Sequence, residues 1–535
     1  MRSVSFISLL IPFVFGNAED LVINIPQGAL RGSIDLDQNG EEYYKFLNIP
    51  YAQPPLGSLR FRAPVPAGGW EGIREVNNEI PSCFQPTLGD SGTEDCLYIH
   101  VYMPELPRND TALKPVMVDI HSGIFIANKP SDGVQYLITK DVVLVNFNFR
   151  LGIFGSFSVD DSELGVPGNP GMKDQVLALK WVRDNIKYFG GDPDNVMIFG
   201  DSSGGVSVHL QVLSPMSEGL FHKALCESGV ALLYSINGVR NNGILLARQL
   251  GVQTENLQEM LVSLQEMSPW SIMLAEQPLT QTYISISTPL VEMASNEPAF
   301  LPEDAITLIQ SGNYNHVPFV IGYNNAEGLS RHIVVKTTTG ENLTITDFTT
   351  FIPTDLGISN DSKEASRVAE RIKRFYYGDT EPSPSDITQA VQLVTDYMFA
   401  YPSYRAAVEH LRTSQSRVYF YYFTADTVLN RNKHVEEVAS KFPGASHTDQ
   451  RGYLIKEDGF PVAEPGSVEE EARERIVTLW TDFAKYSAPW EAINNETFYY
   501  LQIDTNESTL RVGPPKAENM AFWQQLYDEY YPGKM

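Results

Sequence analysis

The sequence around Ser202 constrains the fold of this chain more than any other feature. Residues 196–205 read VMIFGDSSGG, so that an apolar run of strand character ends in Gly-x-Ser-x-Gly. An apolar segment with helical spacing, residues 206–213, follows at once. A strand, a tight turn and a helix in this order predict that the Ser202 hydroxyl is exposed above the end of a sheet. Glycine suits positions 200 and 204 because side chains there would collide with neighbouring backbone.

The motif alone is a weak signal. A chain of 535 residues contains Gly-x-Ser-x-Gly by chance in roughly one case in five, and a glycine-rich turn is the alternative. The strand before the motif and the helix after it favour an activated serine. The backbone N–H of Ser203 would then face the oxygen of a carbonyl group that Ser202 attacks.

Further apolar runs predict the rest of the sheet. Near-continuous runs of strand length occur at residues 116–120, 142–145, 224–226, 317–321 and 418–423, and shorter strands are expected at 21–25 and 29–34. Helical patterns lie between them, as at residues 174–189. Near the C-terminus, Ser467 and Glu470 predict a capping box at the start of a helix. Strands that alternate with helices indicate an α/β fold with a mostly parallel sheet.

Charge and the N-terminal segment narrow the class of protein. The formal net charge of -27 argues against nucleic acid and against an anionic membrane surface as partners. Residues 1–18 resemble a secretory signal peptide, with Arg2 before an apolar stretch and Ala18 as a small residue for cleavage. No later run is long enough to span a membrane. We therefore expect a secreted protein whose residues 19–535 form a single domain, since no linker or repeat divides them.

Sequons and cysteines agree with secretion. Five asparagines stand in glycosylation sequons: Asn109, Asn342, Asn360, Asn495 and Asn506. Cys83 and Cys96 are close in sequence within a polar stretch, and in an oxidising compartment we expect them to pair. Cys226 would remain as a buried free thiol. No cysteine spacing suggests a metal site.

Several ordered motifs resemble those of the type-B carboxylesterases, most closely the secreted insect enzymes. They lie at residues 48–57, 94–98, 146–152, 168–175 and 189–193, followed by the serine turn. The resemblance implies an α/β-hydrolase fold with helical insertions around an active-site gorge. It also implies hydrolysis of a small-molecule carboxylic ester with no cofactor or metal. Buried ion pairs are implied between Arg60 and Glu94 and between Arg150 and Asp174.

The resemblance also supplies candidate partners for Ser202. Ester hydrolysis by serine needs a base beside the hydroxyl and a carboxylate that orients the base, and in α/β-hydrolases the chain order is serine, acid, histidine. Residues 317–328, VPFVIGYNNAEG, match the family segment that carries the acid, which implies Glu327. Residues 442–449, FPGASHTD, resemble the histidine segment, which implies His447.

The expected oxyanion hole departs from the family pattern. Where the family has His-Gly-Gly-Gly or His-Gly-Gly-Ala, this chain has HSGI at residues 121–124. The expected donors are the backbone N–H groups of Gly123, Ile124 and Ser203. We expect Ile124 to take a backbone conformation that suits a β-branched residue and to fill part of the acyl site. Asp201 and Ser203 are also uncommon, because the family more often has Glu and Ala there.

Other members of the family give the alternatives. A neuroligin-like protein for adhesion or ligand sequestration is one, although such relatives usually lose the serine or the histidine. A cholinesterase is disfavoured, because the segment between Cys83 and Cys96 is short and has no tryptophan. A juvenile-hormone esterase is less favoured, because we associate those enzymes with Gln where this chain has Asp201. The natural ester and the oligomeric state stay open.

Overall fold

The computed structural model describes most of the chain. It covers residues 21–86, 92–108, 111–233, 238–282, 286–330, 345–359, 361–383, 385–435 and 439–532. The predicted signal peptide and the sequons at Asn109, Asn342 and Asn360 lie outside these residues. The other two sequon asparagines, Asn495 and Asn506, are exposed.

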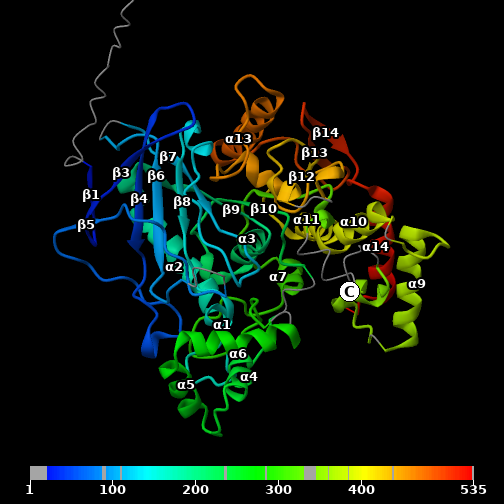
Figure 1. Cartoon of the computed structure of the whole chain (residues 1–535), viewed down its shortest axis with the longest axis horizontal. Coiled ribbons are helices and arrows are strands. Elements are labelled where there is room, and N and C mark those ends of the chain that lie inside the picture. The colour runs from blue at the N-terminus through cyan, green and yellow to red at the C-terminus, as the bar shows by residue number, and fades with distance from the viewer. Residues whose placement is uncertain are drawn as a thin grey trace, which may run out of the picture.

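A large twisted sheet runs through the molecule, and a small sheet lies beside the edge of the large sheet that is formed by its first strands (Figure 1). The strands are β1 Val22–Ile25, β2 Gly28–Arg31, β3 Ser33–Leu36, β4 Glu42–Pro50, β5 Ile73–Glu75, β6 Tyr98–Met103, β7 Lys114–Asp119, β8 Val143–Phe147, β9 Gly191–Asp201, β10 Lys223–Glu227, β11 Phe319–Asn324, β12 Val418–Phe423, β13 Tyr499–Ile503 and β14 Ser508–Val512. The large sheet has the order β14-β13-β12-β11-β10-β9-β7-β8-β6-β4-β3, and the small one β1-β2-β5. Neighbours from β13 across to β8 are parallel, whereas both margins are antiparallel. The expected mostly parallel sheet is confirmed.

Alternate side chains of the central strands enter two different cores. In β9, Val196 and Ile198 belong to the core on one face, and Met197 and Phe199 to the core on the other. The strand β12 alternates in the same way. Strands buried on both faces need apolar residues at every position, which explains the continuous apolar runs in the sequence.

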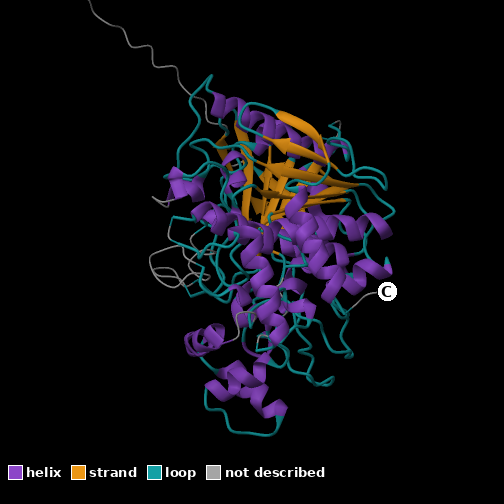
Figure 2. Ribbon diagram, turned by 90° about the vertical axis from the view of Figure 1, so that its right-hand side faces the viewer, coloured by secondary structure: helices purple, strands orange, loops and turns teal. Residues whose placement is uncertain are grey.

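Helices cover both faces of the sheet (Figure 2). They are α1 Gly152–Ser156, α2 Pro170–Asn185, α3 Ser203–Leu213, α4 Asn242–Gln249, α5 Leu257–Glu266, α6 Pro269–Thr282, α7 Ala305–Ser311, α9 Lys363–Tyr377, α10 Ile387–Thr395, α11 Tyr401–Thr413, α12 Arg431–Val435, α13 Val468–Tyr486 and α14 Ala517–Tyr530. Side chains of α2, α3 and α11 join one core, and those of α13 join the other. The helices α4, α5 and α6 gather in a lobe away from the sheet, at the bottom of Figures 1 and 2.

Some predicted boundaries were wrong. The strand expected at 29–34 is two strands, β2 and β3, which pair in different sheets. The chain divides at Gly32, where an added Cβ would lie 2.6 Å from the Lys45 carbonyl oxygen. The helix expected to begin at residue 174 begins at Pro170, a residue that suits the first turn of a helix.

The predicted capping box is only half formed. The Ser467 hydroxyl accepts a hydrogen bond from the Glu470 N–H at 3.2 Å. The Glu470 carboxylate reaches back to the N–H of Gly466 rather than to that of Ser467. The N–H that Glu470 satisfies is that of Gly466, one residue before the N-cap Ser467, so the observed cap differs from a capping box only in this donor.

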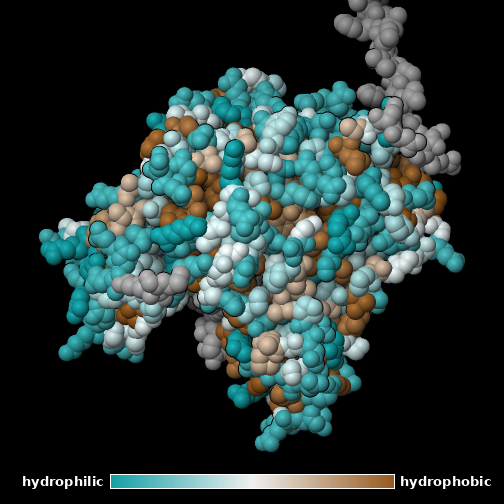
Figure 3. Space-filling view, turned by 180° about the vertical axis from the view of Figure 1, so that it is seen from behind, coloured by the Kyte–Doolittle hydropathy of each residue, from teal (hydrophilic) through white to brown (hydrophobic). Residues whose placement is uncertain are grey.

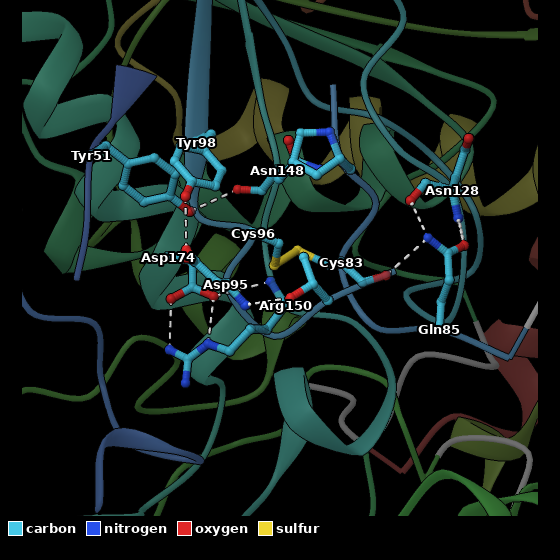
Figure 4. The surroundings of a disulfide bond; sticks show 12 residues. Tyr51, Cys83, Gln85, Asp95, Cys96, Tyr98, Asn128, Asn148, Arg150 and Asp174 are labelled. Carbon is cyan, nitrogen blue, oxygen red and sulfur yellow. Dashed lines mark hydrogen bonds and ion pairs between the residues drawn. A yellow bond between two sulfur atoms is a disulfide. The ribbon is translucent and has the colours of Figure 1, made fainter. Parts of the chain in front are cut away.

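The motifs of the N-terminal third are joined by buried polar contacts. A disulfide links Cys83 and Cys96 (Figure 4). The Arg150 guanidinium donates to both carboxylate oxygens of Asp174, at 2.8 and 2.6 Å. Arg60 and Glu94 form a second two-pronged pair at 2.6 Å. Arg60 also donates to three carbonyl groups at and beyond the end of α5, so it connects the disulfide region to the helical lobe.

On the face shown in Figure 3, hydrophilic residues predominate and apolar residues form small separate patches. Within the ranges that the structure describes, no helix is long and apolar enough to cross a membrane.

Candidate active site

Ser202 lies on a sharp turn between β9 and α3. Its φ of 55° and ψ of -124° are a strained combination for a residue with a side chain. Close backbone packing permits no side chains around the turn: an added Cβ would lie 2.5 Å from the Ile120 carbonyl oxygen at Gly200 and 2.1 Å from it at Gly204. The local pattern of the sequence therefore places Ser202 at the apex of a sharp turn, as predicted, but the residue is partly buried rather than exposed.

His447 lies between Ser202 and Glu327. Its Nε2 is 2.8 Å from the Ser202 Oγ, and its Nδ1 is 2.6 Å from the Glu327 Oε2. An ionised carboxylate only accepts, so Nδ1 carries the proton and Nε2 is left to accept the proton of the Ser202 hydroxyl. This is the geometry that a general base beside a nucleophile requires.

Buried contacts hold both partners of Ser202. Glu327 is fully buried, and its second oxygen accepts the N–H of Asn324 at 2.7 Å. The Asn324 amide in turn donates to the Ser446 carbonyl oxygen, next to His447. The ring of Phe399 packs against the imidazole with 4.6 Å between centroids. The acid and the histidine are thereby fixed relative to each other.

Three other histidines, at positions 121, 209 and 222, have different surroundings. His121 stacks on Phe149, and burial lowers its pKa to about 4. His209 lies in α3 and contacts His410 through their Nε2 atoms at 2.8 Å, and burial lowers its pKa to about 3. His222 accepts the N–H of Val196. Within the described residues, none of these three histidines forms a hydrogen bond with Ser202.

The observed backbone at the expected oxyanion hole differs from the sequence-based prediction. Gly123 has a φ of +116°, and an added Cβ there would lie 1.8 Å from the Ala127 carbonyl oxygen. Ile124 has a φ of 58°, in the left-handed region that β-branched residues avoid, so the expected relaxed conformation was wrong. The residue is 50% exposed. The Ile124 N–H donates to the Ser203 Oγ at 2.9 Å, a contact that the sequence did not suggest.

The sequence also did not predict a buried cluster of charged residues beneath the serine turn. Arg451 follows His447 in the short helix η11 Asp449–Tyr453 and donates to both oxygens of Asp119 at 3.0 and 2.7 Å. It also lies 3.4 Å from Asp201 and 4.0 Å from Glu227. Asp119 was a visible signal, because it is a charged residue within an otherwise apolar predicted strand.

The carboxyl groups around Arg451 outnumber this one cation, since Asp119, Asp201 and Glu227 all lie within 4.0 Å of its guanidinium. Burial raises the pKa of Asp201, although Arg451 opposes the shift. Burial also raises the pKa of Glu227 to about 8. The Trp480 indole N–H donates to the Glu227 carboxyl group at 2.7 Å and supplies a neutral partner. The floor of the site thus holds several carboxyl groups around Arg451.

The described residues offer no metal site. Within them, no group of three or more His, Cys, Asp or Glu side chains is arranged to hold a metal ion. Cys226 is buried, and its thiol lies 3.1 Å from the Gly205 carbonyl oxygen. Burial raises its pKa, which disfavours the reactive thiolate.

Known proteins of similar sequence and structure identify the family. A sequence model described as the carboxylesterase family matches residues 19–523. Esterase FE4 of Myzus persicae is 32% identical over 91% of this chain and 88% of its own length. The juvenile hormone esterase of Tribolium castaneum is 32% identical over 88% of this chain and 85% of its own. The crystal structure of juvenile hormone esterase from Manduca sexta, with OTFP covalently attached, matches with a TM-score of 0.82 at 27% identity and covers 95% of this chain and 99% of that one. This chain therefore belongs to the carboxylesterase family.

Proposed function

We propose that the protein is a secreted serine carboxylesterase that hydrolyses small-molecule carboxylic esters through an acyl-enzyme on Ser202. The contact of His447 with both Ser202 and Glu327 supports this proposal most directly. The predicted signal peptide, the disulfide and the exposed sequons at Asn495 and Asn506 support secretion. Residues 19–535 would act as one domain, without a cofactor or metal.

The proposed reaction has two halves. In the first, the Ser202 Oγ bonds to the carbonyl carbon while the His447 Nε2 takes its proton, and the carbonyl oxygen becomes an anion beside the N–H groups of Gly123 and Ser203. The ester bond then breaks and the alcohol leaves with the proton from His447. In the second half, water gives a proton to His447 and attacks the acyl group, which releases the carboxylic acid and restores Ser202.

A fluorophosphonate probe tests the nucleophile. The purified protein should be labelled at Ser202, as read by mass spectrometry of the modified peptide. Ser202→Ala should abolish labelling, and His447→Ala should lower the turnover of nitrophenyl acetate by on the order of a million-fold. Ser366→Ala, at an exposed serine on α9, is the matched control and should behave as the parent. Labelling at another serine, or none, would favour the sequestration function instead.

Juvenile hormone is a second candidate substrate class. The similarity to two juvenile hormone esterases supports it, whereas Asp201 in the serine turn does not. Turnover of a series of nitrophenyl esters of rising acyl length, beside juvenile hormone itself, would separate a general esterase from a hormone esterase. A hormone esterase should prefer the hormone by at least a hundredfold in kcat/KM.

A further inference from the structure

The hydrogen bond between Ile124 and Ser203 removes a donor from the expected oxyanion hole. Three main-chain N–H groups were expected there, those of Gly123, Ile124 and Ser203. The Ile124 N–H is occupied by the Ser203 Oγ at 2.9 Å. Among the described residues, no hydrogen bond engages the N–H of Gly123 or of Ser203. The resting site therefore offers two free main-chain donors.

The two partners of this bond differ in how far they can move. The peptide between Gly123 and Ile124 is held by a φ of +116° at Gly123 and by hydrogen bonds from the N–H groups of Ile126 and Ala127 to the Gly123 carbonyl oxygen. The Ser203 hydroxyl, in contrast, can leave by rotation about one side-chain bond. A substrate oxyanion can thus recover the Ile124 N–H only by displacing the hydroxyl.

We propose that Ser203 is a built-in plug of the oxyanion hole, which lowers turnover by competing with the substrate oxyanion for the Ile124 N–H. This inference rests on the proposed function, since it takes Ser202 as the nucleophile. The loss of one oxyanion donor typically costs about 10²–10³ in turnover. Because the hydroxyl can rotate away, Ser203 lowers turnover by less than this.

A plug of this kind acts on the transition state more than on the bound ester. The carbonyl oxygen of a bound ester carries little charge, and it gains a full negative charge only when Ser202 attacks. Displacing the hydroxyl becomes favourable at that point. Ser203 should therefore change kcat and leave KM nearly unchanged.

A trifluoromethyl ketone tests the plug without turnover. Ser202 adds to its carbonyl carbon, the proton passes to His447, and the carbonyl oxygen becomes an anion in the hole. Ser203→Ala should bind such a ketone at least tenfold more tightly than the parent. It should also raise kcat for nitrophenyl acetate about ten- to a hundredfold, with KM within threefold. Ser366→Ala, at an exposed serine on α9, should stay near the parent in both measurements.

Each result has one meaning when the same preparations are also treated with a fluorophosphonate. Equal ketone affinity in Ser203→Ala and the parent, with Ser202 labelled, would overturn the plug alone. Weaker binding in Ser203→Ala would overturn it too, because the hydroxyl would then be a donor to the oxyanion. Absence of labelling at Ser202 in both proteins would overturn the proposed function and the plug with it. Faster labelling of Ser203→Ala than of the parent would support both.

Discussion

At the residue scale, the two carboxylate oxygens of Glu327 have different partners. Oε1 accepts the N–H of Asn324 at 2.7 Å, and Oε2 faces the His447 Nδ1 at 2.6 Å. In Glu327→Gln, the backbone donor should hold the amide oxygen and turn the NH₂ group toward His447. The imidazole would then accept at Nδ1 and carry its proton on Nε2, where it cannot take the proton of Ser202. We expect kcat to fall by about 10⁴ with KM nearly unchanged.

Steady-state kinetics on nitrophenyl acetate would measure this fall. Glu266→Gln is the matched control, because Glu266 is an exposed glutamate at the end of α5. A Glu327→Gln enzyme with kcat within tenfold of the parent would show that Glu327 does not select the tautomer of His447.

At the element scale, α6 is joined to α1 through one buried carboxyl group. Glu276 accepts the N–H of Ile153 at 2.9 Å and the hydroxyl of Ser287. Burial raises its pKa to about 7. The folded state therefore holds a proton on Glu276 that the unfolded chain has released above pH 4.5. The free energy of unfolding should fall as the pH rises from about 4.5 to 7, by up to about 1.4 kcal/mol for each pH unit from this group.

Glu276→Gln should remove this part of the pH dependence. The amide oxygen can still accept from Ile153 and Ser287, and the side chain no longer ionises. We expect the variant to gain stability relative to the parent as the pH rises from 5 to 7, as read from urea midpoints at each pH. Glu266→Gln should follow the parent at every pH. Parallel curves for the parent and Glu276→Gln would show that Glu276 titrates normally in the folded protein.

At the scale of the whole molecule, Arg451 links elements from distant parts of the chain. Its carboxyl partners lie at the ends of three strands: Asp119 in β7, Asp201 in β9 and Glu227 in β10. Arg451 itself lies just after His447. Arg451→Met would leave these buried acids without their cation. We expect the free energy of unfolding to fall by about 3–5 kcal/mol at pH 8.

The surface pair of Arg183 and Asp184 provides the comparison. Both side chains are about half exposed, at 49% and 57%, so Arg183→Met should cost less than about 1 kcal/mol. The loss in Arg451→Met should also shrink toward pH 5, because Asp201 and Glu227, whose pKa values burial raises, can then take up protons. Equal losses for the two arginine variants in urea unfolding would show that the cluster does not stabilise the fold.

The sequence by itself determined the local and repeated features of this protein. Continuous apolar runs predicted the buried parallel strands, because a strand covered on both faces needs apolar side chains at every position. The strand, turn and helix around Ser202 were predicted from neighbouring residues alone. Glu327 and His447 were assigned only through the family resemblance, since no local pattern states which loops meet at the end of a sheet.

Only the tertiary structure decided which polar groups pair across the site. Ile124 and Ser203 are 79 residues apart, and Arg451 and Asp119 are 332 apart. Neither pairing follows from local periodicity, because each depends on how strand ends and loops pack together. The same holds for the left-handed backbone at Ile124, which its own side chain disfavours. It occurs where the adjoining Gly123 turn is tightly packed, so the surrounding fold overrides the local preference.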